Sequence, residues 1–158
     1  MTDLILWRHA EAEDLDETDD GGGDDLSRCL TPRGEKQAAR MAAWLDRQLP
    51  HDVRIWCSPA VRTEQTVLPL GRKYRIHPDL APGADVATLL RVAQWPQARQ
   101  PVLIVGHQPT LGQAIAQLLG MAAGHCSVRK GAVWWLRHRE RDGAAQTVVL
   151  CVQTPELL

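Results

Sequence analysis

Three short apolar segments of this chain each end abruptly on polar residues, and this pattern constrains the fold most strongly. Residues 3–7, 53–57 and 101–105 are rich in Leu, Ile, Val and Trp and have the length of buried strands. Helix-like spacings of apolar residues occur between them. The alternation of strands and helices predicts an α/β fold with three layers, α/β/α, around a mostly parallel central sheet.

The clearest helix is predicted to begin at Thr31, whose hydroxyl can cap free N–H groups, with Pro32 in the first helical position. Pro50 ends this helix. Apolar residues within it recur at spacings of three and four and form a stripe that faces the core: Ala38, Met41, Ala42, Leu45 and Leu49. The remaining expected elements are a helix from Ser58 to about Leu70, a short strand at 73–77, helices at 85–93 and 110–119, and a hairpin of 131–137 and 146–152 with Asp142–Gly143 near its turn.

Charge is distributed unevenly along the chain. Residues 11–25 hold nine of the nineteen acidic side chains and no Lys or Arg, so the remainder carries 18 basic against 10 acidic groups. A folded body with surplus positive charge suits an anionic substrate. Residues 13–25 are acidic and Gly-rich, which predicts a flexible loop, and their spacing does not fit an EF-hand.

Several classes of protein do not fit the composition. No apolar run approaches the roughly 18 residues that cross a membrane, and the N-terminus lacks the features of a signal peptide. The four cysteines show no zinc-site or disulfide spacing, and no nucleic-acid-binding motif is found. We therefore expect residues 1–158 to form one cytoplasmic domain with reduced thiols and no nucleic-acid or membrane partner.

Histidine and arginine residues gather where the three strand candidates end. Ligands of open α/β sheets bind outside the carboxyl ends of the strands, so neighbouring strands would bring these residues into one crevice. The residues concerned are Arg8, His9, Arg62 and His107, with Ser58 expected to act only as a helix cap. The guanidinium fork of arginine matches phosphate, and helix N-termini after residues 58 and 107 would add N–H donors. The pattern predicts a phosphoryl-binding site.

Three motifs resemble those of the histidine phosphatase superfamily, also called phosphoglycerate-mutase-like. Residues 6–11 (LWRHAE) resemble its Arg-His-Gly motif, residues 58–66 (SPAVRTEQT) its Ser-Pro-x-x-Arg-x-x-x-Thr motif, and residues 106–109 (GHQP) its Gly-His-x-Pro motif. Ala10 replaces the usual Gly, which would be strained if that position required a positive φ.

The short length of the chain and two further segments narrow the resemblance to one type within this superfamily. Residues 28–34 (RCLTPRG) are similar to the Arg-Pro-Leu-Thr-x-x-Gly stretch of SixA-type phosphohistidine phosphatases, with Cys29 in place of Pro, and residues 78–85 also resemble that type.

The resemblance implies that His9 attacks phosphorus and becomes a phosphohistidine, which water then hydrolyses. Arg8, Arg62 and His107 would hold the phosphoryl oxygens, with Arg28 reaching in from the loop before the first helix. No metal or other cofactor is implied. The second ring nitrogen of His9 is expected to donate to a backbone carbonyl or a carboxylate.

A proton donor for the leaving group is less evident. Asp79, Asp85 and Glu11 are candidates, although either Asp is better explained as a turn residue or a helix cap. A phosphohistidine substrate needs less help, because its leaving imidazole has a pKa of about 6.5. The expected substrate is therefore phosphohistidine in a protein. Two alternatives are a phosphatase for small phosphorylated metabolites and a module that binds phosphate or phosphohistidine without turnover.

Overall fold

One mixed sheet forms the centre of the protein. The computed structural model describes residues 1–15 and 24–158; the middle of the acidic segment, where a flexible loop was expected, lies outside the described residues. The strand order is β3-β2-β4-β1-β5-β6, and of these strands β5 alone runs opposite to the others. The strands are β1 (Thr2–Arg8), β2 (Arg54–Cys57), β3 (Arg75–Ile76), β4 (Val102–Gly106), β5 (Val133–Arg141) and β6 (Ala144–Gln153).

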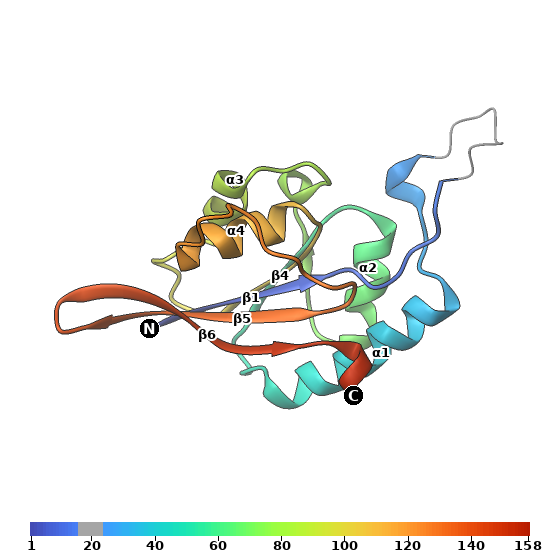
Figure 1. The fold of residues 1–158 in the computed structure, drawn as a ribbon. Helices are drawn as coiled ribbons and strands as arrows, with labels where there is room; N and C mark the ends of the chain where they lie inside the picture. Colours follow the sequence, from blue (N-terminus) through green and yellow to red (C-terminus); the bar gives the residue numbers. More distant parts are fainter. Residues whose placement is uncertain (16–23) are drawn as a thin grey trace.

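Helices cover both faces of this sheet (Figure 1). They are α1 (Pro32–Gln48), α2 (Val61–Val67), α3 (Val86–Val92) and α4 (Thr110–Leu119), with short 3₁₀ turns at Asp25–Ser27, Leu68–Leu70, Pro78–Leu80 and Pro155–Leu157. Leu4 and Leu6 pack with residues of α3 and α4, while Ile5 and Trp7 pack with residues of α1 and α2. This alternation follows from the two-residue period of a strand and confirms the three-layer α/β/α prediction.

Helix α1 forms as its sequence predicts. The Thr31 hydroxyl accepts a hydrogen bond from the Gly34 N–H at 2.9 Å, and Pro32 occupies the first turn. The predicted apolar stripe is buried along its whole length. Ala38 also contacts a small cluster with Ala10, Ala12 and Leu30, so the helix packs against the segment that follows His9.

The C-terminal hairpin is longer than expected. Predicted at 131–137 and 146–152, its strands reach Arg141 and start again at Ala144. Charged residues near the turn hide the strand signal, because this part of the ladder is paired by the backbone and largely exposed. Asp142 and Gly143 form the turn with φ of 54° and 78°, as a two-residue hairpin requires.

No helix of the described residues is long and apolar enough to cross a membrane.

Gly34 allows α1 to approach the chain next to the nucleophile candidate. A Cβ atom at this position would collide with the backbone carbonyl of Glu11, two residues after His9. We expect Gly34→Ala to lower the free energy of unfolding by about 3 kcal/mol, since backbone atoms must move. Lys36→Ala, on the exposed side of the same helix, should stay within about 0.5 kcal/mol of the parent. Urea unfolding of the three proteins measures this, and equal stability of Gly34→Ala and the parent would disprove the close approach.

Candidate active site

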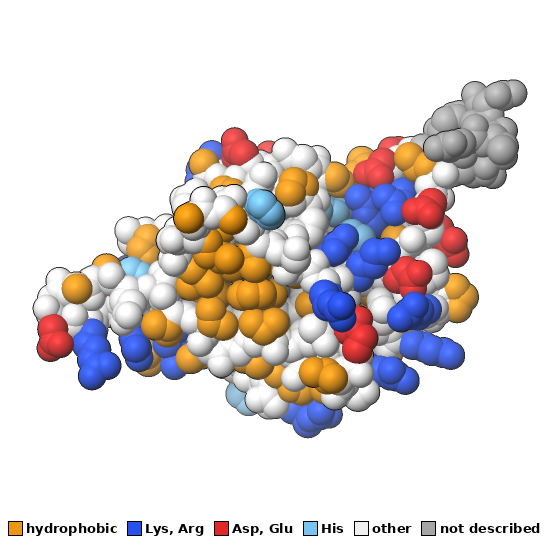
Figure 2. All heavy atoms as spheres, in the orientation of Figure 1, with side chains coloured by type: hydrophobic (Ala, Val, Ile, Leu, Met, Phe, Trp, Pro, Cys, Tyr) orange, Lys and Arg blue, Asp and Glu red, His pale blue; other side chains and the backbone are white. Residues whose placement is uncertain are grey.

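The carboxyl ends of three neighbouring strands meet as predicted. In the order β2-β4-β1, the His9 N–H donates to the Gly106 carbonyl at 3.2 Å and the Ser58 N–H donates to the Val105 carbonyl at 3.1 Å. The rings of His9 and His107 therefore lie side by side, with centroids 5.3 Å apart and planes inclined by 54°. On the face shown in Figure 2, Lys and Arg side chains gather beside histidine at the end of the molecule that carries α2. Two histidines and several cations thus share one edge of the sheet.

His9 is held with one defined ring nitrogen available. Its Nδ1 lies 2.7 Å from the Ala10 carbonyl oxygen, which can only accept, so Nδ1 carries the proton and donates it. Nε2 is then the unprotonated nitrogen, as the sequence led us to expect. Burial lowers the pKa of His9 to about 4, against the opposing effect of the Ala10 hydrogen bond, and the charges of Arg62 and Arg8 lower it further. The ring is a neutral nucleophile candidate at physiological pH.

Ala10 fits the position usually held by Gly without strain. Its φ is not positive, and its side chain is fully buried beside Ala38. The Ala10 N–H donates to the Thr66 hydroxyl at 3.0 Å, and that hydroxyl donates in turn to the Arg62 carbonyl at 2.7 Å. Thr66 thereby joins α2 to the residue after His9. Thr66 is the last residue of the motif at 58–66, but its contact with Ala10 was not predicted from the sequence.

Ser58 is not the helix cap that was expected. Helix α2 begins at Val61 after Ala60, and no side chain caps it. The Ser58 hydroxyl instead lies 2.7 Å from His107 Nε2 and accepts the Ala60 N–H at 3.3 Å. The Ser58 hydroxyl can donate to His107 Nε2 while it accepts from Ala60, and in this tautomer the imidazole proton is on Nδ1. Burial lowers the pKa of His107 to about 3, so this ring is neutral as well.

Buried nitrogens without partners surround the two histidines. Within the described part of the chain, four buried side-chain nitrogens lack a hydrogen-bond partner, and three are Arg8 Nε, Arg62 Nε and His107 Nδ1. Unpaired buried donors are unfavourable and uncommon. Part of Arg8 is anchored through Nη1 to the Val128 carbonyl at 2.7 Å, and Arg62 is only 4% exposed. The arrangement provides N–H donors for an anion with several oxygen atoms.

Asp25 is a site residue that sequence reasoning missed. One carboxylate oxygen lies 3.1 Å from Arg62 Nη2, the other lies 3.1 Å from Arg28 Nη1, and its backbone carbonyl accepts from Arg62 Nη1 at 2.8 Å. Asp25 closes a segment of nine similar acids, so its sequence context does not distinguish it. Its spacing of three residues from Arg28, which suits an ion pair, was the one feature of the sequence that could have indicated its role. These bonds lower the pKa of Asp25 against the opposing effect of partial burial.

Arg28 reaches the site from the loop before α1, as expected. Its Nε donates to the Glu13 carbonyl at 2.6 Å, and its positive charge contributes to the low pKa of His9. The ends of the acidic segment are also ordered: Ala12 pairs with Leu30, and the Glu13 N–H donates to the Cys29 carbonyl at 2.8 Å. At the two ends of the acidic segment, the described residues therefore take part in backbone pairing and ion pairs, whereas the flexibility expected for the segment stays a prediction.

The three proton-donor candidates each have another partner. Asp85 caps α3 by accepting from the Thr88 N–H at 2.8 Å, and Asp79 lies 3.7 Å from Arg91 on the surface. Glu11 lies 3.7 Å from Arg33. The cap role for Asp85 is confirmed. The structure does not bring any of these three carboxylates into hydrogen-bond contact with His9 or His107.

No cluster of three or more His, Cys, Asp or Glu side chains is arranged to hold a metal ion in residues 1–15 and 24–158.

The low pKa values of the two histidines predict a pH effect. Both values, about 4 for His9 and about 3 for His107, lie below the ordinary 6.5. As pH falls below 6.5 the unfolded chain takes up these protons first, so the free energy of unfolding should decrease between pH 6.5 and about 4. NMR titration of the imidazoles should find both neutral at pH 5.5. Titration of either ring near pH 6.5 would contradict the structure.

A three-layer α/β fold with two histidines and two arginines at the carboxyl ends of β1, β2 and β4 defines a phosphatase class. The family model of the histidine phosphatase superfamily (branch 1) matches residues 4–84, and the chain belongs to this superfamily. Within it, the chain is similar to the SixA proteins. The SixA homolog of Haemophilus influenzae is 32% identical over 133 residues, which cover 74% of this chain and 77% of that protein.

Two further SixA proteins are also similar to this chain. Escherichia coli SixA is 30% identical over 123 residues, which cover 73% of each chain. The solved structure of SixA from Nakamurella multipartitia superposes with a TM-score of 0.76 at 28% identity and covers 98% of this chain and 96% of its own. Family membership makes the protein a hydrolase of the phosphatase class.

Proposed function

We propose that this protein removes the phosphoryl group from phosphohistidine in another protein, through a phosphohistidine intermediate on its own His9. The observation that carries the proposal is the set of unpaired buried donors on Arg8, Arg62 and His107 around a neutral, oriented His9. Such preorganised donors stabilise the charge that develops on a transferring phosphoryl group.

In the proposed reaction, the lone pair of His9 Nε2 attacks phosphorus while the bond to the leaving group breaks. The Ala10 carbonyl keeps the proton on Nδ1, so no proton has to leave the nucleophile before attack. Arg8, Arg62, Arg28 and the Nδ1–H of His107 bind the phosphoryl oxygens. Water then attacks the phosphorus of phospho-His9, the P–N bond breaks, and inorganic phosphate leaves.

The expected substrate class depends on whether a carboxylic acid near His9 can protonate the leaving group. A sugar or serine phosphate releases a poor alkoxide leaving group, which requires a carboxylic acid beside it. Asp25 is near the site, but its ion pairs with Arg62 and Arg28 keep it ionised, so it is a poor proton donor. Asp79, Asp85 and Glu11 have partners elsewhere. None of these four carboxylates of the described residues is thus placed to protonate a leaving group. An imidazole that carries a proton on its second ring nitrogen leaves as a neutral group, whose conjugate acid has a pKa of about 6.5, and so needs no such donor.

The relatives support the same substrate. The two curated relatives carry the names phosphohistidine phosphatase SixA and its homolog. Their similarity covers about three quarters of this chain.

Turnover of different phosphorylated substrates tests the proposal. A carrier protein phosphorylated on histidine is compared, through kcat/KM at pH 7.5, with a peptide phosphorylated on serine and with a sugar phosphate. We expect at least about a hundredfold preference for phosphohistidine, which corresponds to roughly 3 kcal/mol of transition-state stabilisation. Equal values, or faster hydrolysis of phosphoserine or a sugar phosphate, would favour a general phosphomonoesterase. Phosphate binding without turnover of any substrate would indicate a binding module.

A further inference from the structure

A second concave region lies at the other end of the strands. A cavity of about 850 Å³ is bordered by Arg54 and Val102, the first residues of β2 and β4. His9 and His107 follow the opposite, carboxyl ends of β1 and β4. Small-molecule sites in proteins measure about 300–1,000 Å³. The cavity has the size of a ligand site and is separate from the phosphatase site.

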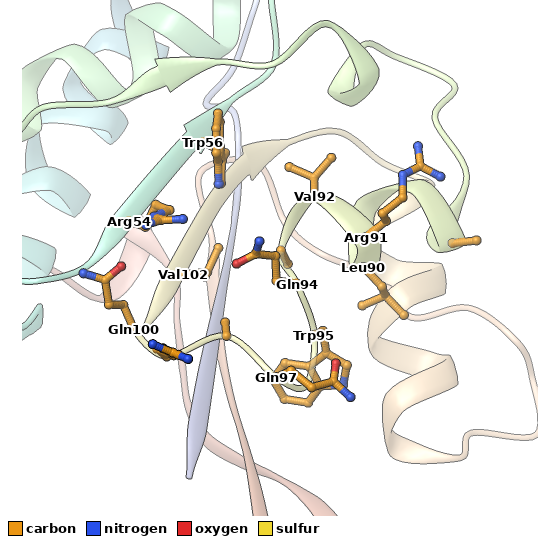
Figure 3. Close-up of a pocket in the computed structure, with 14 residues that line it drawn as sticks. Arg54, Trp56, Leu90, Arg91, Val92, Gln94, Trp95, Gln97, Gln100 and Val102 are labelled. Carbon is orange, nitrogen blue, oxygen red and sulfur yellow. The ribbon is translucent and has the colours of Figure 1, made fainter.

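Two tryptophans line this cavity. Trp56 projects from β2 and Trp95 from the segment after α3, and Figure 3 shows their side chains on different sides of a common space. Trp56 contacts the His77 ring edge-on with centroids 5.4 Å apart, and Trp95 contacts the His138 ring at 5.6 Å. Both indoles are half-buried and fixed by these contacts, so each presents a defined aromatic surface.

The charged residues of the lining are all arginines. Arg54, Arg91 and Arg99 line the cavity, and no Asp or Glu is among its lining residues in the described chain. Arg91 is 3.7 Å from Asp79 at the rim. Arg54 and Arg99 have no carboxylate within 4.0 Å among residues 1–15 and 24–158. The positive charge therefore has little compensation from the protein.

A neighbouring cavity extends the positive surface. It measures about 400 Å³, shares Arg54 and Trp56 among other residues with the first, and adds Lys73 and Arg75 together with one acid, Asp52. Arg54 thus lies where the first cavity meets a second one whose lining has a net positive charge. A ligand with a ring at one end and an anionic group at the other would match both cavities.

We infer that this cavity binds a planar aromatic anion of the nucleotide class. The indoles of Trp56 and Trp95 offer stacking surfaces for a base, and the Arg54 and Arg99 guanidinium groups offer paired donors for phosphate oxygens. A simple inorganic anion would leave the aromatic walls unused. The site lies outside the proposed reaction and does not depend on it.

Calorimetric titration with ADP tests the inference, with inorganic tungstate present to occupy the His9 site and prevent turnover. We expect ADP to bind with a Kd below about 1 mM and with the same affinity with and without tungstate. The double variant Arg54→Ala/Arg99→Ala should weaken ADP binding at least about tenfold. The matched control Arg40→Ala/Arg47→Ala removes the same charge from the exposed side of α1 and should bind as the parent does.

Three results would overturn the inference. ADP that does not bind at about 10 mM excludes a nucleotide site. Loss of ADP binding when tungstate is added assigns the binding to the His9 site. Equal weakening in the two double variants assigns it to net charge alone. Thermal melting of both variants shows that they are folded, and hydrolysis at the His9 site should be unchanged in both.

Discussion

Replacing His9 with Ala is expected to abolish turnover and the covalent intermediate together. The proposed reaction forms its new bond at Nε2 of this ring, which is left unprotonated because Nδ1 donates its proton to the Ala10 carbonyl. The corresponding nitrogen of His107 is instead bonded to the Ser58 hydroxyl. Loss of a nucleophile reduces kcat by about 10⁴-fold or more. Incubation with a ³²P-labelled phosphohistidine protein, followed by gel electrophoresis at alkaline pH, should label the parent and not the variant. The label should be acid-labile, as a phosphoramidate is.

The control for this experiment is another histidine. His51 is exposed in the turn after α1, and His51→Ala should keep the labelling and the turnover of the parent. If His9→Ala still acquires acid-labile phosphate, the nucleophile lies elsewhere, with His107 the next residue to replace. If neither the parent nor the variant is labelled while phosphate is released, hydrolysis proceeds without the proposed intermediate.

Arg62→Ala should cause the second largest loss. The Arg62 guanidinium is buried at the site with an unpaired Nε, and the proposed reaction directs it at the phosphoryl oxygens. Removing one such donor lowers kcat about 10²–10³-fold, or roughly 3–4 kcal/mol. Arg62→Lys should recover little of it, because an ammonium group cannot donate a parallel pair of hydrogen bonds. Steady-state kinetics with the histidine-phosphorylated carrier protein measures both variants.

Arg72 provides a matched control for the loss of a structural arginine. It bonds the Asp46 carboxylate at 2.9 Å and the Pro50 carbonyl at 2.8 Å, at the C-terminal end of α1. Arg72→Ala should lower the melting temperature and leave kcat near that of the parent. If Arg62→Ala and Arg72→Ala lose activity in proportion to stability, the Arg62 effect is structural.

Much of the fold could be predicted because its signals are local. The Thr31 cap and the spacing from Ala38 to Leu45 mark α1 within one segment, and both are present in the structure. The carboxyl-end placement of His9 and His107 needed one additional assumption, that β1, β2 and β4 are neighbours. The sheet order satisfies it. Parallel strands buried on both faces are unbroken apolar runs, which makes them easy to find.

The contacts of Ser58 and Asp25 could not be predicted, because they depend on distant segments. Ser58 has the sequence context of a helix cap, and only the approach of β4 gives it His107 as a partner, 49 residues away. Asp25 meets Arg62 across 37 residues. A side chain that can bond either locally or at long range gives the same sequence signal in both cases.

The carboxylate of Asp25 reduces the net positive charge of the proposed site. It is paired with Arg62 and Arg28 in the structure, so an arriving phosphoryl group binds through donors that are still unpaired, such as Arg62 Nε. The negative charge of Asp25 also repels the phosphate, which weakens phosphate binding relative to a site without this carboxylate. Asp25 would thus limit product inhibition, and phosphate should inhibit Asp25→Asn at lower concentrations than it inhibits the parent.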